Sequence, residues 1–274
     1  MIETAFDKNK ANMKFEINGL NVSYALSGPE SAPVVCLSHS LACSAIMWDP
    51  QLAALADGFR VLRYDTRGHG ETDAPDGPYT LDQLADDAVA LLDALEIDKV
   101  HWVGLSMGGM IGQSLGIRHP RRLLSLALCD TLSVVPEEAQ STWTERIETA
   151  RTQGMSPLCE PTLARWFTPA YRERHPPALD SIRRQILATP VAGYIGCCEA
   201  IRRIDYLDRL GGIRLPTCVI VGADDPATPP PASEAIHQRI AGSSLTLIDD
   251  AAHLSNVEQP EAFNRALLGF LSSL

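Results

Sequence analysis

The sequence predicts an α/β protein with a mostly parallel, twisted sheet, helices on both faces and a helical insertion. Over residues 1–132, short apolar runs typical of buried strands alternate with stretches of helical period. Residues 133–212 contain no strand-like run and are broken repeatedly by proline, and the alternation returns over residues 213–274. Such alternation is typical of a parallel sheet covered on both faces. We therefore expect a core of residues 1–132 and 213–274 and a helical cap at 133–212.

The strands are predicted as follows. Residues 15–28 alternate apolar and polar side chains around the turn signal Asn18-Gly19, which predicts a β-hairpin. Nearly continuous apolar runs at residues 32–40 and 59–65 predict strands that are buried on both faces. Further strands are predicted at residues 99–106, 123–131, 217–225 and 244–253.

Amphipathic stretches between these runs predict helices. Residues 79–97 contain a capping box of Thr80 and Gln83, and their leucines recur at helical spacing. The other predicted core helices span residues 107–120, 230–242 and 258–274. In an open sheet of this kind, ligands bind beyond the carboxyl ends of the strands, so we expect the functional site there.

Composition limits the classes of partner. The chain has 274 residues, of which 45% are hydrophobic and 21% charged, as is usual for a globular protein. With 23 basic and 34 acidic side chains, the formal net charge is −11. This charge opposes binding to nucleic acid or to an anionic membrane surface, so we expect a small-molecule partner. A homo-oligomer is compatible with the sequence.

We expect a cytoplasmic protein. The first 15 residues contain no apolar stretch that could form a signal-peptide core, and no segment approaches the roughly 20 apolar residues of a membrane helix. The seven cysteines are scattered, and none shows zinc-ligand spacing. We therefore expect reduced, packed thiols and no metal site.

One serine stands where a predicted strand meets a predicted helix. Gly104-Leu105-Ser106-Met107-Gly108 fits the pattern G-x-S-x-G, in which a sharp turn brings the flanking positions together and leaves room only for glycine. The turn holds the hydroxyl outward, and the amide groups that begin the helix stabilise negative charge beside it. We expect Ser106 to be a nucleophile.

A serine hydroxyl is a weak nucleophile and needs a base. Among the seven histidines, His253 follows a predicted strand and would lie at the same sheet edge as Ser106. His39 also ends a predicted strand and is the main rival. We expect packing roles for His69 and His101, and surface positions without a partner for His119, His175 and His237.

The base needs a carboxylate that holds it in one tautomer. Asp224 and Asp225 both end the predicted strand at 217–225, and their position alone leaves the choice between them open. The oxyanion of an acyl-transfer reaction also needs two hydrogen-bond donors. We expect these to be the backbone N–H groups of Met107 and Leu41.

Five motifs, in this order, resemble the α/β-hydrolase superfamily across nearly the whole chain. They read HSL, YDTRGHGET, GLSMGGMIGQ, GADDPATPP and AAHLSNVEQP. The resemblance implies the α/β-hydrolase fold. It also implies an acid three residues after Gly222, which selects Asp225 and gives a triad in the order Ser106, Asp225, His253.

Within the superfamily, the chain is most similar to the 3-oxoadipate enol-lactonases of aromatic-acid catabolism. The similarity lies in the motifs MWDPQ, RIETARTQGM, RWFTPAY, GYIGCCEAIRRID and HLSNVEQP. The motifs of the insertion matter most, because insertions set substrate choice whereas the sheet supports the triad. The chain departs from the group at His39-Ser40-Leu41-Ala42, where those lactonases often have Asn-Ser-Leu-Gly.

The resemblance implies a serine hydrolase that opens an ester or lactone, here 3-oxoadipate enol-lactone, through an acyl-enzyme and without a metal or organic cofactor. Trp143 and Trp166 are candidates for an apolar wall of the substrate pocket. Arg165 and Arg203, with Arg202 as a further choice, are candidates for pairing with a substrate carboxylate.

Three other functions fit the same residues. A broad carboxylesterase would differ only in its substrate preference, and a C–C bond hydrolase uses the same triad. A non-catalytic binding protein could retain all three residues. A dehalogenase is disfavoured because it normally has Asp where this chain has Ser106.

Overall fold

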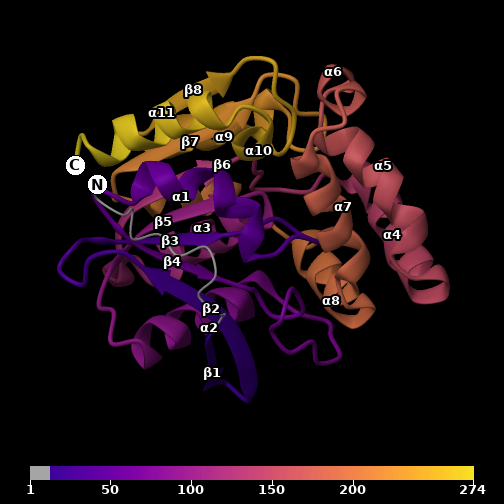
Figure 1. Cartoon of the computed structure of the whole chain (residues 1–274), viewed down its shortest axis with the longest axis horizontal. Helices are drawn as coiled ribbons and strands as arrows, with labels where there is room; N and C mark the ends of the chain where they lie inside the picture. The colour runs from indigo at the N-terminus through magenta and orange to yellow at the C-terminus, as the bar shows by residue number, and fades with distance from the viewer. Residues whose placement is uncertain (1–12) are drawn as a thin grey trace, which may run out of the picture.

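One eight-stranded sheet, in the order β1-β2-β4-β3-β5-β6-β7-β8, forms the centre of the computed structural model, which describes residues 13–274 (Figure 1). The strands are β1 (Met13–Ile17), β2 (Leu20–Ser27), β3 (Val34–Ser38), β4 (Arg60–Tyr64), β5 (Val100–Leu105), β6 (Leu123–Cys129), β7 (Thr217–Gly222) and β8 (Ser244–Ile248). β2 pairs antiparallel with β1 and β4, and all pairings from β4 to β8 are parallel. The predicted α/β class with a mostly parallel sheet is confirmed.

The β1–β2 hairpin turns at Asn18 and Gly19. Their φ angles are 49° and 72°, in the left-handed region that glycine and asparagine enter at the lowest cost. The predicted hairpin is therefore confirmed.

Helices cover both faces of the sheet (Figure 1). Three helices pack together: α1 (Asp49–Leu55), α10 (Ser255–Glu258) and α11 (Pro260–Leu271). A second group consists of α2 (Leu81–Ala94) and α3 (Met107–Arg118), which pack on each other. The helix α9 (Pro230–Arg239) packs beside β7 and β8. Thr80 Oγ1 accepts the Gln83 N–H at 3.0 Å, as expected for the predicted cap of α2. α1 was not predicted, because seven residues are too few to show a helical period.

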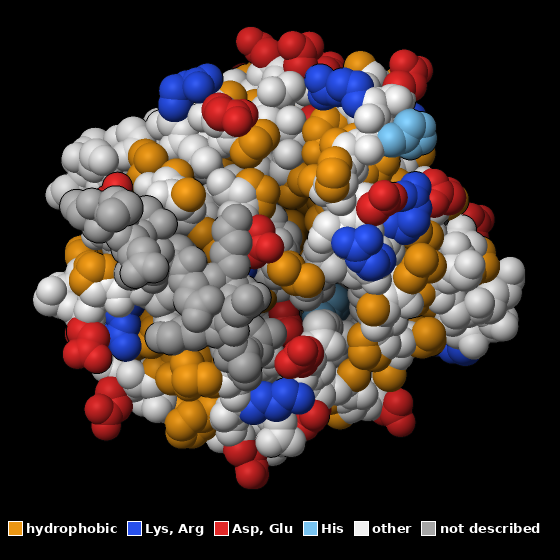
Figure 2. Space-filling model, viewed as in Figure 1, with side chains coloured by type: hydrophobic (Ala, Val, Ile, Leu, Met, Phe, Trp, Pro, Cys, Tyr) orange, Lys and Arg blue, Asp and Glu red, His pale blue; other side chains and the backbone are white. Residues whose placement is uncertain are grey.

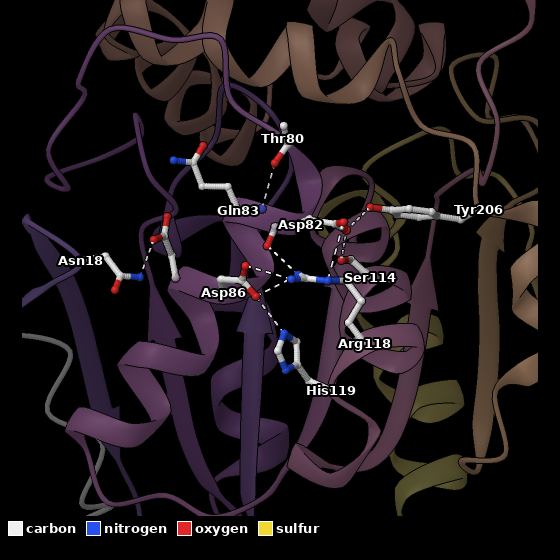
Figure 3. Close-up of polar contacts among 10 residues, drawn as sticks. Asn18, Thr80, Asp82, Gln83, Asp86, Ser114, Arg118, His119 and Tyr206 are labelled. Carbon is white, nitrogen blue, oxygen red and sulfur yellow. Dashed lines mark hydrogen bonds and ion pairs between the residues drawn. The ribbon is translucent and has the colours of Figure 1, made fainter.

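A polar cluster ties α2 to its neighbours (Figure 3). Asp82 accepts a hydrogen bond of 2.7 Å from the hydroxyl of Tyr206, which follows the last helix of the insertion, and Asp86 pairs with Arg118 at 2.9 Å. His119 lies 2.8 Å from Asp86, so the expectation that His119 has no partner is wrong.

The segment between β6 and β7 is helical. It contains α4 (Gln140–Gln153), α5 (Ser156–Trp166), α6 (Pro169–Glu173), α7 (Pro177–Ala188) and α8 (Val191–Ile201), which stand to one side of the sheet in Figure 1. We call residues 133–212 the cap. Its two ends lie side by side, since Val134 bridges Asp205 and the Tyr206 N–H donates to the Ser133 carbonyl at 2.8 Å. That the cap is a domain apart from residues 1–132 and 213–274 stays a prediction.

Glycines let the cap approach the core closely. A Cβ atom on Gly193 of α8 would lie 1.9 Å from the carbonyl oxygen of Gly68, and one on Gly196 would lie 2.6 Å from the Tyr79 ring. Real Cβ atoms do not come so near, so this contact exists only because both positions of α8 lack a side chain.

The visible face of the molecule carries acidic and basic side chains interspersed with apolar ones (Figure 2). Within residues 13–274, none of the helices is both long enough and apolar enough to cross a membrane.

We predict that Gly193→Ala destabilises the protein by about 1–3 kcal/mol, because the added methyl group must push α8 away from the Gly68 backbone. Gly269→Ala is the matched control. Gly269 lies in α11, and a Cβ atom added there would meet open space, so alanine should leave stability unchanged or raise it by up to about 1 kcal/mol. Urea unfolding of both variants tests this, and equal midpoints would contradict it.

Candidate active site

Ser106 occupies the turn that joins β5 to α3. Its φ and ψ angles are 55° and −114°, a strained conformation for a residue with a side chain. The turn is held from both sides: the Ser106 N–H donates to the Cys129 carbonyl, and the Thr131 hydroxyl donates to the Ser106 carbonyl, each at 2.8 Å. The backbone of Ser106 is therefore fixed before any substrate arrives.

Two glycines make this turn sterically feasible. A Cβ atom on Gly104 would lie 2.1 Å from the Gly108 carbonyl oxygen, and one on Gly108 would lie 2.1 Å from the Ser38 carbonyl oxygen. The structure thus gives a physical reason for glycine on both sides of Ser106 in the sequence.

A continuous chain of hydrogen bonds joins Ser106, His253 and Asp225. The Ser106 Oγ lies 2.9 Å from His253 Nε2, and His253 Nδ1 lies 2.9 Å from Asp225 Oδ2. Asp225 follows β7 and His253 follows β8, so residues far apart in sequence meet at one edge of the sheet. Asp224, the alternative acid, is exposed and does not contact His253 in the described structure.

The environment of Asp225 keeps it ionised. Burial raises its pKa, but the neighbouring His253 and several hydrogen bonds outweigh burial and lower the pKa overall. The donors include the Ala227 N–H at 2.7 Å and the Thr228 hydroxyl at 2.6 Å. An ionised Asp225 accepts the Nδ1–H of His253, which leaves the Nε2 lone pair facing Ser106.

Thr228 was missed by the sequence analysis. Besides its bond to Asp225, its hydroxyl lies 3.2 Å from His253 Nδ1. The sequence does place a hydroxyl three residues after Asp225, but this spacing is common in turns and does not by itself indicate a role at the site.

A second missed residue, Glu258, links the loop of His253 to the cap. Its buried carboxylate accepts the Ala252 N–H at 2.9 Å and, from the cap, the Thr168 N–H at 3.0 Å and the Thr168 hydroxyl. Burial raises the pKa of Glu258. The Trp166 ring centroid also lies 6.0 Å from that of His253. The cap and the His253 loop are thus bound together.

Another buried carboxylate, Asp130, lies near the triad without joining it. It accepts the Gly222 N–H at 2.8 Å and the Ser255 hydroxyl at 2.6 Å. Burial raises the pKa of Asp130 well above its usual value, and the charge of Asp225 adds to the rise.

His39 is not positioned as a base, so the rival assignment is wrong. Its Nε2 accepts the Thr66 N–H at 2.9 Å, and its Nδ1 lies 2.8 Å from the Ser40 carbonyl. His69 is buried in the same way, with Nε2 accepting the Ala42 N–H at 2.9 Å. Both rings therefore hold the loop after β3 through its backbone.

The remaining histidines are structural or exposed. His101 lies within β5 and bonds the Ser125 hydroxyl at 2.9 Å, as a packing role requires. His237 bonds Ser243 at 2.8 Å, so the expectation that it has no partner is wrong. His175 is exposed.

The loop after β3 brings Leu41 to the same cavity as Ser106. Ala42, next in the chain, has a φ of 58°, and His69 holds its N–H. Met107 is the first residue of α3, where N–H groups have no acceptor within the helix. In the described part of the chain, the N–H groups of Leu41 and Met107 donate to no other protein atom.

A cavity of about 400 Å³ opens above Ser106 and His253, between the core and the cap. Trp143, Trp166 and Arg165 line it, as does Arg146, which the sequence analysis did not select. Tyr194, Thr142 and Thr162 of the cap also line it.

Arg203 does not line this cavity, so its assignment as a substrate contact is wrong. It pairs with Glu199 at 2.8 Å, and its side chain is 55% exposed. Arg202 pairs with the same carboxylate at 2.9 Å. The spacing of charges along α8 could have revealed this, because Glu199 stands three and four residues before the two arginines.

We predict that His69 makes stability fall in mild acid. Burial lowers its folded-state pKa from 6.5 to about 3, so the unfolded chain takes up this proton first. The contribution of neutral His69 to the free energy of unfolding is fully present above about pH 6.5. It is lost as the pH falls toward 3, by up to about 1.4 kcal/mol per pH unit.

His69→Gln should reduce this slope between pH 6.5 and 5, because glutamine still accepts the Ala42 N–H but takes up no proton. Urea unfolding at several pH values measures the slope, with His175→Gln, at an exposed position, as the control. An unchanged slope in His69→Gln would contradict the prediction.

Comparison with known proteins gives the family. The family model described as the alpha/beta hydrolase fold matches residues 33–260. Two 3-oxoadipate enol-lactonases of Acinetobacter baylyi are 38% and 36% identical to the chain, over 90% and 93% of it and 91% and 95% of their own lengths.

Comparison with solved structures gives the same family. The enol-lactonase from Burkholderia xenovorans superposes with a TM-score of 0.92 and 41% identity, covering 95% of this chain and 100% of that one. A thermophilic esterase from Thermogutta terrifontis gives a TM-score of 0.88 and 30% identity, covering 96% and 97%. The resemblance inferred from the motifs is confirmed, and the chain belongs to the α/β-hydrolase family.

Proposed function

We propose that the protein is a serine hydrolase that opens a carboxylic ester or lactone through an acyl-enzyme, with 3-oxoadipate enol-lactone as its substrate. The observation that carries the proposal is the hydrogen-bond chain from Asp225 through His253 to Ser106 at the floor of the cavity. This arrangement supplies a nucleophile, a base and an orienting acid in one place.

In the proposed reaction, Ser106 Oγ attacks the carbonyl carbon while His253 Nε2 takes the hydroxyl proton. Asp225 stabilises the imidazolium that forms. His253 then gives the proton to the departing oxygen, which in a lactone stays attached to the acyl group. A water molecule, deprotonated by His253, attacks the acyl-enzyme and releases the acid.

The negative oxygen of each tetrahedral intermediate would be held by the N–H groups of Leu41 and Met107. Two features support this role. Both groups are unused within the described protein, and the Met107 N–H belongs to the positive end of the α3 dipole. The bonds from His39 and His69 to the backbone preorganise the Leu41 loop.

The substrate is proposed from the relatives and the cavity together. Two 3-oxoadipate enol-lactonases match nearly the whole chain, and an enol-lactonase structure superposes closely. A cavity of about 400 Å³ is suited to a small molecule. We propose that Trp143 and Trp166 pack against the substrate and that Arg165 binds its polar end.

We propose that the protein works in the cytoplasm. All seven of its cysteines are free and buried, which favours a reducing compartment.

A broader esterase is the second candidate, favoured by the 30% identity to the Thermogutta terrifontis esterase. The two candidates share the triad and differ in which acyl group the cap admits. A comparison of kcat/KM for 3-oxoadipate enol-lactone and 4-nitrophenyl acetate separates them, and a lactone preference of about 100-fold or more identifies the lactonase.

We predict that Ser106→Ala lowers kcat/KM for every substrate the wild type turns over, by as much as about 10⁶-fold, because no nucleophile remains. Circular dichroism should show an intact fold, because the substitution removes only a hydroxyl group and no packing contact of the turn. Near-full hydrolysis by the folded variant would overturn the mechanism.

We predict that Asp225→Asn lowers kcat on the order of 10⁴-fold, because the amide cannot hold the required His253 tautomer. Asp130→Asn is the matched control, a buried aspartate of the same region that does not touch His253. Its activity should stay within about tenfold of the wild type, because the carboxyl of Asp130 is already biased toward its neutral form. Equal losses in both variants would contradict the assignment of the acid.

A further inference from the structure

A second cavity lies behind the loop that follows β3. Its volume is about 420 Å³, and it is lined by that loop, by residues at and after the end of β4 and by the cap helix α7. Residues 40–42 of the loop line the cavity above Ser106, whereas residues 43–45 line the second one. The loop thus forms part of the wall of both cavities. We call the second one the rear cavity.

The loop is held from the side of the rear cavity. The Oε1 atom of Gln185, on α7, accepts the Ser44 N–H at 2.9 Å and the Ser44 hydroxyl at 3.1 Å. The Asp65 carboxylate accepts the Ala45 N–H at 2.8 Å. Gln185 and Asp65 both line the rear cavity. Because Ser44 lies only three residues from Leu41, these bonds fix the segment that would offer the Leu41 N–H to the oxyanion.

Gln185 has hydrogen-bonding capacity that the described protein does not use. The residue is only 8% exposed, and its Nε2 atom has no hydrogen-bond partner within residues 13–274. A buried amide N–H without an acceptor costs about 1–3 kcal/mol, and native structures contain few such groups. Because Gln185 lines the rear cavity, an oxygen atom of a molecule bound there would supply the missing acceptor.

The rear cavity also has one cation and one anion without a partner. Its ionic lining residues are Arg63, Asp65, Glu71 and Arg184. Arg63 pairs with Asp49, and the carboxylate of Asp65 accepts two backbone N–H groups. In the described part of the chain, the exposed side chains of Glu71 and Arg184 form no ion pair, either with each other or with a third residue. The rear cavity therefore offers a ligand one group of each sign.

We propose that the rear cavity binds a small zwitterion with an aliphatic side chain, of the class of the branched α-amino acids, as an effector of the hydrolase. Its carboxylate would lie at Arg184 and at Nε2 of Gln185, and its ammonium group at Glu71. Its side chain would cover Ile46, an isoleucine of the lining that is 51% exposed. This inference goes beyond the proposed function, because no step of the hydrolysis uses the rear cavity.

The effector would act on the hydrolysis through Gln185. A ligand oxygen at Nε2 fixes the side chain whose Oε1 holds Ser44, and this makes the loop that carries Leu41 more rigid. A rigid loop holds the Leu41 N–H in place for the oxyanion, which exists only after the substrate carbonyl has been attacked. The effector should therefore raise kcat by about twofold or more and leave KM nearly unchanged.

The first experiment measures the binding of L-leucine by calorimetry and ligand-observed NMR. Two analogues each lack one charge: 4-methylpentanoate has no ammonium group, and 3-methylbutylamine has no carboxylate. Wild type should bind leucine saturably and both analogues at least about tenfold more weakly. Ala188→Trp, which fills the rear cavity, should abolish leucine binding. Leu187→Trp is the matched control, since Leu187 is the adjacent exposed residue and does not line the rear cavity.

Two charge variants test the same site without filling it. Arg184→Gln and Glu71→Gln should each weaken leucine binding by about tenfold or more, whereas Arg203→Gln, outside the rear cavity, should not. Both substitutions are at exposed positions, so they decide the inference even if Ala188→Trp fails to fold. No saturable binding of leucine to wild type up to about 10 mM would overturn the site, as would undiminished binding by both charge variants.

The second experiment measures the effect of leucine on the turnover of an ester or lactone. Leucine should raise kcat in wild type and in Leu187→Trp, and it should have no effect on Ala188→Trp. Inhibition that is competitive with the substrate would place leucine above Ser106 and overturn the inference, and binding without a change in kcat would overturn the effector role. If wild type turns over neither, the proposed function fails, whereas the binding experiment still decides whether the rear cavity is a site.

Discussion

The candidate site depends on one steric constraint, the turn in which β5 passes directly into α3 at Ser106. The backbone there takes a φ of 55°, and neither Gly104 nor Gly108 has space for a Cβ atom. Because the turn is this tight, the Ser106 side chain cannot fold back onto the sheet and stands at its carboxyl edge. The same turn starts α3 beside the serine, so the N–H groups at the positive end of the helix dipole face the oxygen that would become negative. Nucleophile and charge stabilisation thus come from a single local geometry.

Everything else at the site is brought to that turn from a distance. β7 and β8 lie beyond β6 in the sheet, and the loops that follow them deliver Asp225 and His253, while the loop after β3 delivers Leu41. Buried polar groups fix each of these segments. His69 holds the Leu41 loop through the Ala42 N–H, and Glu258 holds the His253 loop while also binding Thr168 of the cap. Because Glu258 joins the cap to the His253 loop, a displacement of the cap would also move the loop that carries the base.

The sequence predicted the parts of this arrangement that are local. The Ser106 turn is encoded within five residues, and the strands appear as apolar runs or, in the first hairpin, as alternation around a turn signal, so both could be predicted directly. The choice of Asp225 over Asp224 needed the family resemblance, because adjacent aspartates at a strand end look alike until the fold shows which one faces His253. Arg203 was misassigned although Glu199, four residues earlier in the sequence, already offered it an ion-pair partner. Glu258 was missed because its partner Thr168 lies far away in the chain. Thr228 was missed because a hydroxyl three residues after an aspartate is common in turns, and Arg146 because it has no hydrogen-bond or ion-pair partner in the described protein.

The central claim is that Ser106 forms a covalent acyl-enzyme, and trapping that species tests it most directly. Wild type would be mixed with a 4-nitrophenyl ester, quenched in acid within milliseconds, digested and examined by mass spectrometry. The account predicts that the acyl mass appears on the peptide containing Ser106 and disappears at the rate of turnover, and that Asp130→Asn shows the same adduct. Turnover without an adduct on that peptide, or an adduct on another residue that forms and decays at the catalytic rate, would contradict it.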